Sequence, residues 1–457
     1  MKNILIKTVS IVVAFILLAT VFVGCGGKDG TVFESDGFKY KVYSDHVELI
    51  EYVGNGGKVT VPDSLKGEPV TVLAEGLFKN RSNITEITIP SSVTDIQAEA
   101  FSHCTALTVV NVPEGVKTMG TGVFSFCSAL KLVTLPSTVA VLPDNAFYQC
   151  FSLERVEFKS GLTEIKPYGF YQCRAMTAVS FPDTLKTVGK YAFCGCSALE
   201  TVTLSDSIET LSQGCFEECS RLTSFTSGKG LKTIEDNVFV MCPKLSSVTL
   251  NDGLCKIGNN VFADSSIAEI VFPDTVKDLG SCLTGCKLLT SVKLPQSMGV
   301  LAKSMFEGCK LLETVEIPSQ VTAIGDRAFF GCEKLQVPTM PEKLVMVGDN
   351  AFTQCIKFDK ITFPDSLQSI GKGSFSQCVT LTDVNLGNGL ISIGEGAFES
   401  CWKMRYITLP ATVSRVGDNA FKSCSYLRVI TIKQEKDSLD TSKWGQGFSI
   451  TWKPDKQ

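Results

Sequence analysis

The sequence has very few of the residues on which most catalytic and metal sites depend. Only two of its 457 residues are histidines, His46 and His103, and no His-Glu-x-x-His arrangement occurs. A Gly-x-Ser-x-Gly segment, which would mark a hydrolase nucleophile, is also missing. Both histidines fall in predicted turns, where we interpret them as surface residues. We therefore expect that the protein is not an enzyme.

Phosphate-binding loops and basic blocks are missing as well. Gly394-Glu395-Gly396 is followed by Glu399 where a dinucleotide-binding loop has its third glycine, and no glycine-rich loop ends in Gly-Lys-Ser or Gly-Lys-Thr. The 43 basic and 47 acidic residues are scattered along the chain and give a formal net charge of −4. Because no Lys/Arg block follows a phosphate backbone, we expect neither a cofactor nor a nucleic-acid partner.

The composition is that of a folded protein, with 44% hydrophobic and 20% charged residues. A chain of 457 residues is longer than one hydrophobic core usually supports, which predicts either several domains or a repeat architecture.

The first 24 residues differ from the rest. Lys2 and Lys7 flank the start of an almost purely apolar stretch that ends at Val23, and no acidic residue occurs before Asp29. This layout predicts a signal peptide over residues 1–24, because the apolar stretch is shorter than the roughly 20 residues of a membrane span. A single membrane anchor is the alternative.

Phe22-Val23-Gly24-Cys25 resembles a bacterial lipobox, with Phe22 where that pattern prefers leucine. The resemblance implies a lipid on Cys25, which would become the first mature residue and bind the protein to a membrane. We then expect an extracytoplasmic lipoprotein, anchored at the bacterial cell membrane or surface, with residues 25–37 as the lipidated cysteine and a flexible tether.

One spacing dominates the remainder of the chain. Phenylalanine recurs in steps of 23 residues, the step from Phe262 to Phe306 being bridged by Leu283, which gives about sixteen units. The phenylalanines are Phe78, Phe101, Phe124, Phe147, Phe170, Phe193, Phe216, Phe239, Phe262, Phe306, Phe329, Phe352, Phe375, Phe398 and Phe421.

Each unit reads as one coil of a solenoid. After the phenylalanine comes a short alternation such as Val110-Asn111-Val112, which predicts a strand with one buried face, and then a second aliphatic residue such as Ile165. A single coil exposes apolar faces above and below, so neighbouring coils must stack in register. Stacking predicts a parallel β-sheet on one face of an elongated molecule.

The unit from Leu312 to Cys332 (LETVEIPSQVTAIGDRAFFGC) resembles the BspA-like leucine-rich repeat, and the resemblance covers roughly residues 59–432. It implies an α/β-type repeat solenoid, a curved, right-handed array of about 16 coils found on bacterial surface proteins. Some members are associated with adhesion to host proteins or to other cells. The family carries no catalytic residues to transfer.

Both ends depart from the repeat, as expected where a solenoid must be covered. Alternation around Phe38 and Leu49 predicts a β-hairpin cap, followed by an irregular first coil, over residues 38–77. The solenoid proper then spans 78–432 and a C-terminal cap spans 433–457. The coil from Phe262 to Leu283 is two residues short, which predicts a local kink or, alternatively, a binding site.

Fourteen of the 19 cysteines lie three residues after the phenylalanine position, from Cys104 to Cys424. This predicts an interior column of small buried side chains. Disulfides between coils are disfavoured because parallel side chains rarely meet the required dihedral angle, and a spacing of 23 residues is not that of a metal site.

The outward residues of the predicted strands form a strip of small polar groups. We expect it to bind an extracellular protein or glycan, and its central candidates are Thr134, Glu157, Ser180, Thr203, Thr226 and Thr249. The leading hypothesis is adhesion or recognition at the cell surface. The alternatives are an envelope scaffold or spacer without a specific ligand and a protein that captures glycans or peptides. The sequence defines no oligomeric state.

Overall fold

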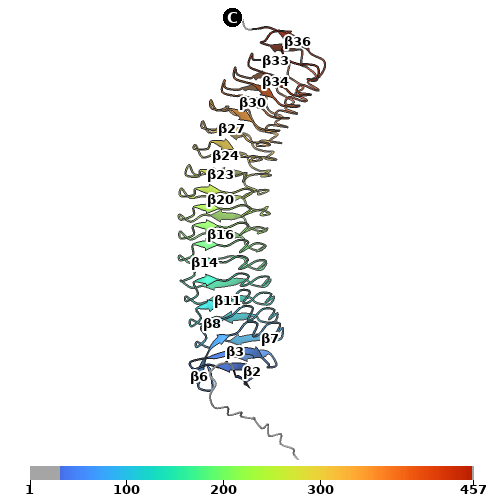
Figure 1. Cartoon of the computed structure of the whole chain (residues 1–457). Helices are drawn as coiled ribbons and strands as arrows, with labels where there is room; N and C mark the ends of the chain where they lie inside the picture. The colour runs from blue at the N-terminus through green and yellow to red at the C-terminus, as the bar shows by residue number, and fades with distance from the viewer. Residues whose placement is uncertain (1–30, 455–457) are drawn as a thin grey trace, which may run out of the picture.

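The computed structural model describes residues 31–454, and these form an elongated, curved column of stacked coils (Figure 1). The described residues contain 36 β-strands and no helix. Two series of sixteen strands follow one another along the column, each divided into several parallel sheets that are here called the first and the second ladder, and turns close each coil. The predicted solenoid is therefore confirmed, and its coil count agrees roughly with the sixteen that were expected, since two further coils have no strand on the first ladder.

The first ladder carries the predicted strand face, in which strands of neighbouring coils pair in parallel within several separate two- and three-stranded sheets. Val133, for example, lies in register with Val110 below it and Val156 above it. The strands are β4 (Gly57–Thr60), β7 (Ile84–Thr88), β9 (Val109–Asn111), β11 (Leu132–Leu135), β13 (Arg155–Phe158), β16 (Thr201–Thr203), β18 (Ser224–Thr226), β20 (Ser247–Thr249), β22 (Glu269–Val271), β24 (Ser291–Lys293), β26 (Thr314–Val315), β29 (Lys360–Thr362), β31 (Asp383–Asn385), β33 (Tyr406–Leu409), β35 (Val429–Ile432) and β36 (Ser449–Trp452).

The second ladder stands where the sequence showed only one aliphatic residue per coil. Its strands are mostly two residues long, too short to give an alternating pattern, so the sequence predicted one sheet where the structure has two. They are β6 (Glu68–Leu73), β8 (Asp95–Ile96), β10 (Thr118–Met119), β12 (Val141–Leu142), β14 (Glu164–Ile165), β15 (Thr187–Val188), β17 (Thr210–Leu211), β19 (Thr233–Ile234), β21 (Lys256–Ile257), β23 (Asp278–Leu279), β25 (Val300–Leu301), β27 (Ala323–Ile324), β28 (Met346–Val347), β30 (Ser369–Ile370), β32 (Ser392–Ile393) and β34 (Arg415–Val416).

The third side of the coil corrects the α/β expectation, because it consists of turns. Backbone groups there bond between coils instead of along a helix, as when the Phe101 N–H donates to the Val123 carbonyl at 2.9 Å. The residues two before and two after the phenylalanine commonly have left-handed backbone angles, such as Glu99 (φ 55°) and His103 (φ 61°). Two such residues in each coil prevent a continuous right-handed helix.

The interior consists of the predicted columns. Consecutive phenylalanine rings stack, with centroids 5.0 Å apart between Phe101 and Phe124 and 5.8 Å apart between Phe398 and Phe421. The cysteine column is also buried, and its thiols donate to the phenylalanine carbonyl of the preceding coil, as Cys150 Sγ does to Phe124 O at 3.1 Å. All 18 cysteines in residues 31–454 are free thiols.

The N-terminal cap is the predicted hairpin with one strand more than expected. Strands β2 (Phe38–Val42) and β3 (Val47–Tyr52) pair in antiparallel fashion, and β3 joins β6 of the second ladder. Strand β1 (Val32–Ser35) adds to β2, so the end of the segment assigned to a flexible tether is instead ordered in the sheet. A two-residue strand, β5 (Ser64–Leu65), pairs with β6.

At the C-terminus the chain continues the ladder. Strand β36 lies parallel to β35 in register, and Trp444 is buried against the Phe421 ring, with centroids 6.0 Å apart. The last phenylalanine of the column is thus covered by a tryptophan.

The short coil is accommodated without losing the core. Leu283 is fully buried in the phenylalanine column, and Ser265, which replaces the cysteine, lies 3.4 Å from the Cys286 sulfur.

Candidate binding surface

The strand face brings three of the predicted strip residues directly together. Thr203, Thr226 and Thr249 lie in register on β16, β18 and β20, and all three are exposed. Adjacent strands in a sheet are about 4.8 Å apart, so the three hydroxyl groups form a regular row. The inward residue of each strand anchors the row: Val202 and Phe225 are buried, and Val248 is half-buried.

These hydroxyl groups have no partner within residues 31–454, whereas threonines elsewhere in the coil do. Thr163 donates to the Ala140 carbonyl at 2.9 Å, and Thr412 donates to the Leu390 carbonyl at 2.7 Å. Threonines such as Thr163 and Thr412 thus join neighbouring coils, while Thr203, Thr226 and Thr249 are left exposed to solvent.

A second row lies beside the first, and sequence reasoning missed it. Thr201, Ser224 and Ser247 are also in register, two residues before the predicted row. They point to the same side of the sheet because side chains alternate along a strand. The alternation along each strand carries the signal, since the residue two positions before the predicted one faces the same side.

The remaining predicted strip residues are placed differently. Thr134 and Glu157 are neighbours on β11 and β13, where the Thr134 hydroxyl donates to a Glu157 carboxylate oxygen at 3.4 Å. Glu157 also pairs with Arg155 at 2.8 Å, so this end of the strip is satisfied internally. Ser180 is exposed but lies in a coil without a strand, which separates the sheet of β13 from that of β16.

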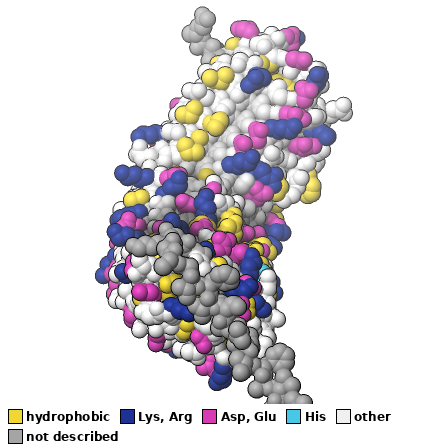
Figure 2. All heavy atoms as spheres, turned by 60° about the horizontal axis from the view of Figure 1, so that its bottom comes forward, with side chains coloured by type: hydrophobic (Ala, Val, Ile, Leu, Met, Phe, Trp, Pro, Cys, Tyr) yellow, Lys and Arg dark blue, Asp and Glu magenta, His cyan; other side chains and the backbone are white. Residues whose placement is uncertain are grey.

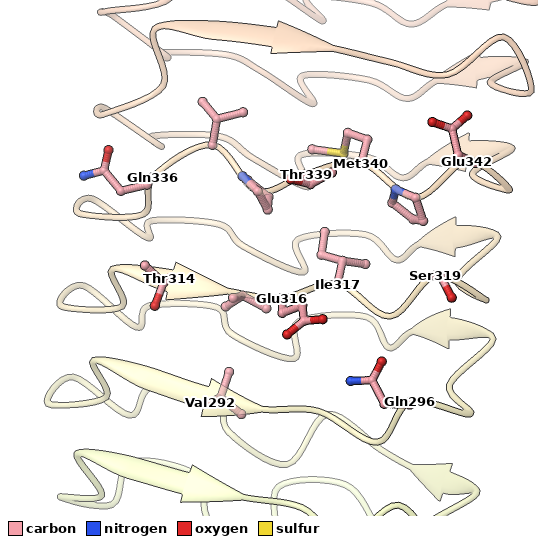
Figure 3. Close-up of a pocket in the computed structure, with 14 residues that line it drawn as sticks. Val292, Gln296, Thr314, Glu316, Ile317, Ser319, Gln336, Thr339, Met340 and Glu342 are labelled. Atoms are coloured by element: carbon pink, nitrogen blue, oxygen red, sulfur yellow. The ribbon is translucent and has the colours of Figure 1, made fainter.

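The strand face is interrupted a second time near the C-terminal third. The segment from Gln336 to Glu342 contains Pro338 and Pro341 and forms no strand, so β26 has no partner above it. A hollow of about 890 Å³ opens there, with Ile317 and Met340 in its floor and Glu316 and Glu342 among its polar lining residues (Figure 3).

Charges on the surface are mixed in sign. Lys and Arg side chains alternate with Asp and Glu over the face seen in Figure 2. Many pair between coils, as Lys372 does with Glu395 at 2.9 Å. Within the described residues, no group of three His, Cys, Asp or Glu side chains is arranged as a metal site.

The buried thiols are held in their neutral form. Burial raises the pKa of the Cys150 and Cys378 thiols to about 12, and it raises the pKa of Cys173 well above its usual range. A thiolate is the reactive form of cysteine, so these groups are poor nucleophiles and metal ligands. Their role is packing and a weak hydrogen bond to the preceding coil.

Aromatic side chains on the outer turns were also missed by sequence reasoning. Tyr148 stacks on Tyr171 with centroids 4.8 Å apart, and Tyr168 stacks on Tyr191 at 5.4 Å. The available signal was their constant offset from the phenylalanine column. Burial raises the pKa of Tyr171 and Tyr191 above the usual range, although both rings stay partly exposed.

The stacked coils, the interior phenylalanine and cysteine columns and the exposed strand face define a repeat solenoid of the leucine-rich class. The sequence matches the family described as BspA type Leucine rich repeat region in six copies, over residues 59–177, 163–284, 255–359 and 345–446. The chain therefore belongs to the BspA-type leucine-rich repeat family. No curated protein matches the sequence.

One solved structure supports the fold, and two more are similar over most of the chain with lower TM-scores. A leucine-rich repeat protein from Bacteroides ovatus superimposes with a TM-score of 0.66 at 22% identity, over 92% of this chain and 99% of that one. A leucine rich cell surface protein from Faecalibacterium prausnitzii gives a TM-score of 0.37 at 18% identity, covering 94% and 96% of the two chains. The pneumococcal vaccine antigen PcpA gives 0.36 at 17% identity, covering 94% and 100%.

The predicted signal peptide and the lipidation residue Cys25 lie outside the described residues. From residue 31 to residue 454, no helix is long and apolar enough to cross a membrane.

Proposed function

We propose that the protein is a cell-surface lipoprotein that recognises an extracellular protein or glycan along its strand face. The observation that carries this proposal is the double row of hydroxyl groups on β16, β18 and β20, of which all but the half-buried Ser224 are on exposed residues and none bonds to another group within residues 31–454. A solenoid presents such rows as one rigid, extended platform, so many weak polar contacts can add up to a specific interaction.

The family membership agrees with a binding role, because leucine-rich repeat solenoids serve as interaction scaffolds. Lipid attachment at Cys25 would hold the platform at the membrane surface, and adhesion to host or neighbouring-cell molecules is the role we assign to it. Lipidation is tested separately, by mass spectrometry of the mature N-terminus with Cys25→Ser as the control.

The binding proposal is tested with immobilised matrix glycoproteins, mucins and a glycan array. Thr226→Lys places a long charged side chain in the centre of the row, and it should weaken binding of any retained ligand at least tenfold, or about 1.4 kcal/mol. The double variant Thr203→Lys/Thr249→Lys should abolish it. Thr121→Lys adds the same charge to an exposed turn and should bind normally.

A spacer without a ligand would bind nothing on the panel, and a ligand bound elsewhere would be unaffected by all three strand-face substitutions. Either result would reject recognition through the strand face.

A further inference from the structure

A second surface lies outside the strand face, on the turn that follows each column cysteine. This turn presents one outward residue per coil, and in three consecutive coils that residue is apolar: Ile356, Val379 and Trp402. They line a hollow of about 360 Å³ together with Glu333, Gln354, Gln377 and Ser400. The in-register stacking of coils therefore places an apolar stripe beside a polar one.

Trp402 is the central feature of this hollow, since 51% of its surface is exposed. Phe151 occupies the same position eleven coils earlier, but there the Arg174 guanidinium lies over the ring, 4.9 Å from its centroid. The coil above Trp402 has Ser425 at the equivalent place. Among residues 31–454, no cation or aromatic ring covers the indole.

A row of polar side chains on successive coils lies beside Trp402. Gln354, Gln377 and Ser400 occupy equivalent left-handed positions, with φ of 64°, 61° and 59°, which aligns their side chains on successive coils. The Gln354 amide nitrogen donates to the Gln377 carbonyl oxygen at 3.0 Å. This bond leaves the Gln377 amide N–H groups and the Gln354 carbonyl oxygen available to a ligand.

The charge of the hollow is balanced. Glu333 is its one charged lining residue, and its carboxylate pairs with Lys310 at 2.9 Å. A ligand with a net charge would therefore find no opposite charge free to compensate it.

We propose that this hollow binds a neutral hexose unit of a glycan. A pyranose ring has an apolar face of C–H bonds and a rim of hydroxyl groups. The C–H face fits the electron-rich face of the Trp402 indole, while hydroxyl groups at the rim can bond to the amides of Gln354 and Gln377 and to Ser400. A concave, mostly apolar surface with a few converging polar groups is the usual form of a small-molecule site.

This site goes beyond strand-face recognition and does not depend on it. Trp402 lies in the turn before β33, on a different part of the coil from the hydroxyl rows of β16 to β20. The two sites respond to different substitutions, so one can fail while the other stands.

The test is a binding assay of the full chain on an array of neutral gluco-, manno-, galacto- and N-acetylhexosamine oligosaccharides, with sialylated and sulfated glycans as the charged comparison. We expect saturable binding to one neutral class. Trp402→Ala should weaken it at least tenfold and Gln377→Ala at least threefold. Phe151→Ala removes the cation-capped aromatic at the equivalent position and should leave binding unchanged, as should Thr121→Lys on an exposed turn.

Chemical denaturation of each variant checks that it remains folded; Trp402→Phe, which keeps a flat ring, should retain most of the binding. The proposal is overturned if no neutral glycan binds saturably, if only charged glycans bind, or if Phe151→Ala weakens binding as much as Trp402→Ala. It is also overturned if Trp402→Ala abolishes binding of a protein ligand while no glycan binds.

Discussion

The interior columns and the outer turns of this solenoid use the same repeat in opposite ways. Inside, the phenylalanine position holds its identity in fifteen coils, because each ring must stack on the rings above and below. Outside, the position after the column cysteine changes from Phe151 to Arg174 to Trp402 along the chain. The interior therefore sets the fold, and the variable exterior is where recognition can be encoded.

The largest expected effect concerns the interior thiols in alkaline solution. Their folded pKa values, about 12 for Cys104 and Cys150, lie above the ordinary value of 9.0. The folded state thus keeps protons that the unfolded state releases, so stability is complete below pH 9 and falls as the pH rises toward 12. Each such thiol lowers the free energy of unfolding by about 1.4 kcal/mol per pH unit in this window.

Denaturant unfolding at pH 8, 9, 10 and 10.5 measures this loss. Cys150→Ala removes one of the thiols and should reduce the slope by about 1.4 kcal/mol per pH unit. A free energy of unfolding that stays constant up to pH 10.5 would contradict a raised pKa of the buried thiols in the cysteine column.

A matched pair of phenylalanines compares how much an interior and an exterior side chain contribute to stability. Phe193 is buried, 5.0 Å from Phe170 and 5.3 Å from Phe216, and Phe193→Ala should cost about 3–5 kcal/mol through the cavity it leaves. Phe151 is 36% exposed, and Phe151→Ala should cost less than about 1 kcal/mol. Urea denaturation compares the two, and equal losses would show that burial does not distinguish the positions.

A smaller effect of opposite sign is expected in the outer turns. Met241 is 58% exposed and has a left-handed backbone, with φ of 59°. Met241→Gly should stabilise the protein by about 1 kcal/mol, because only glycine adopts this conformation without strain. Met241→Ala removes the side chain but keeps the strain, so its midpoint of unfolding should stay close to that of the wild type. If both variants behave alike, the turn is not strained.

The interior was predictable from the sequence because its contacts repeat. Phe101 and Cys104 recur every 23 residues, and stacking neighbours is the physical arrangement that satisfies that spacing. The second ladder was not predictable, because a two-residue strand such as Glu164–Ile165 gives no alternation. The absence of a helix depends on left-handed backbone angles at residues such as Glu99. Glutamate has no marked preference for such angles, so the sequence does not predict them.

The candidate surface was predictable only in part. Thr203, Thr226 and Thr249 followed from strand alternation, and the structure places them in one row. Whether a hydroxyl is free depends on contacts between coils, which is why Thr134 is bonded to Glu157 while Thr226 has no partner in the described chain. The Trp402 indole is uncovered because the next coil has the small Ser425 at the equivalent position. The sequence of one repeat does not show which residue of the next coil lies over it.

The most direct measurement pairs binding with stability in the Thr203→Lys/Thr249→Lys protein. These side chains are exposed and bond to no other group in residues 31–454. The account predicts that binding to the retained ligand is abolished while the midpoint of urea denaturation stays within experimental error of the wild type. Unchanged binding would contradict recognition through the strand face, and a large fall in the midpoint would show that these exposed residues serve the fold.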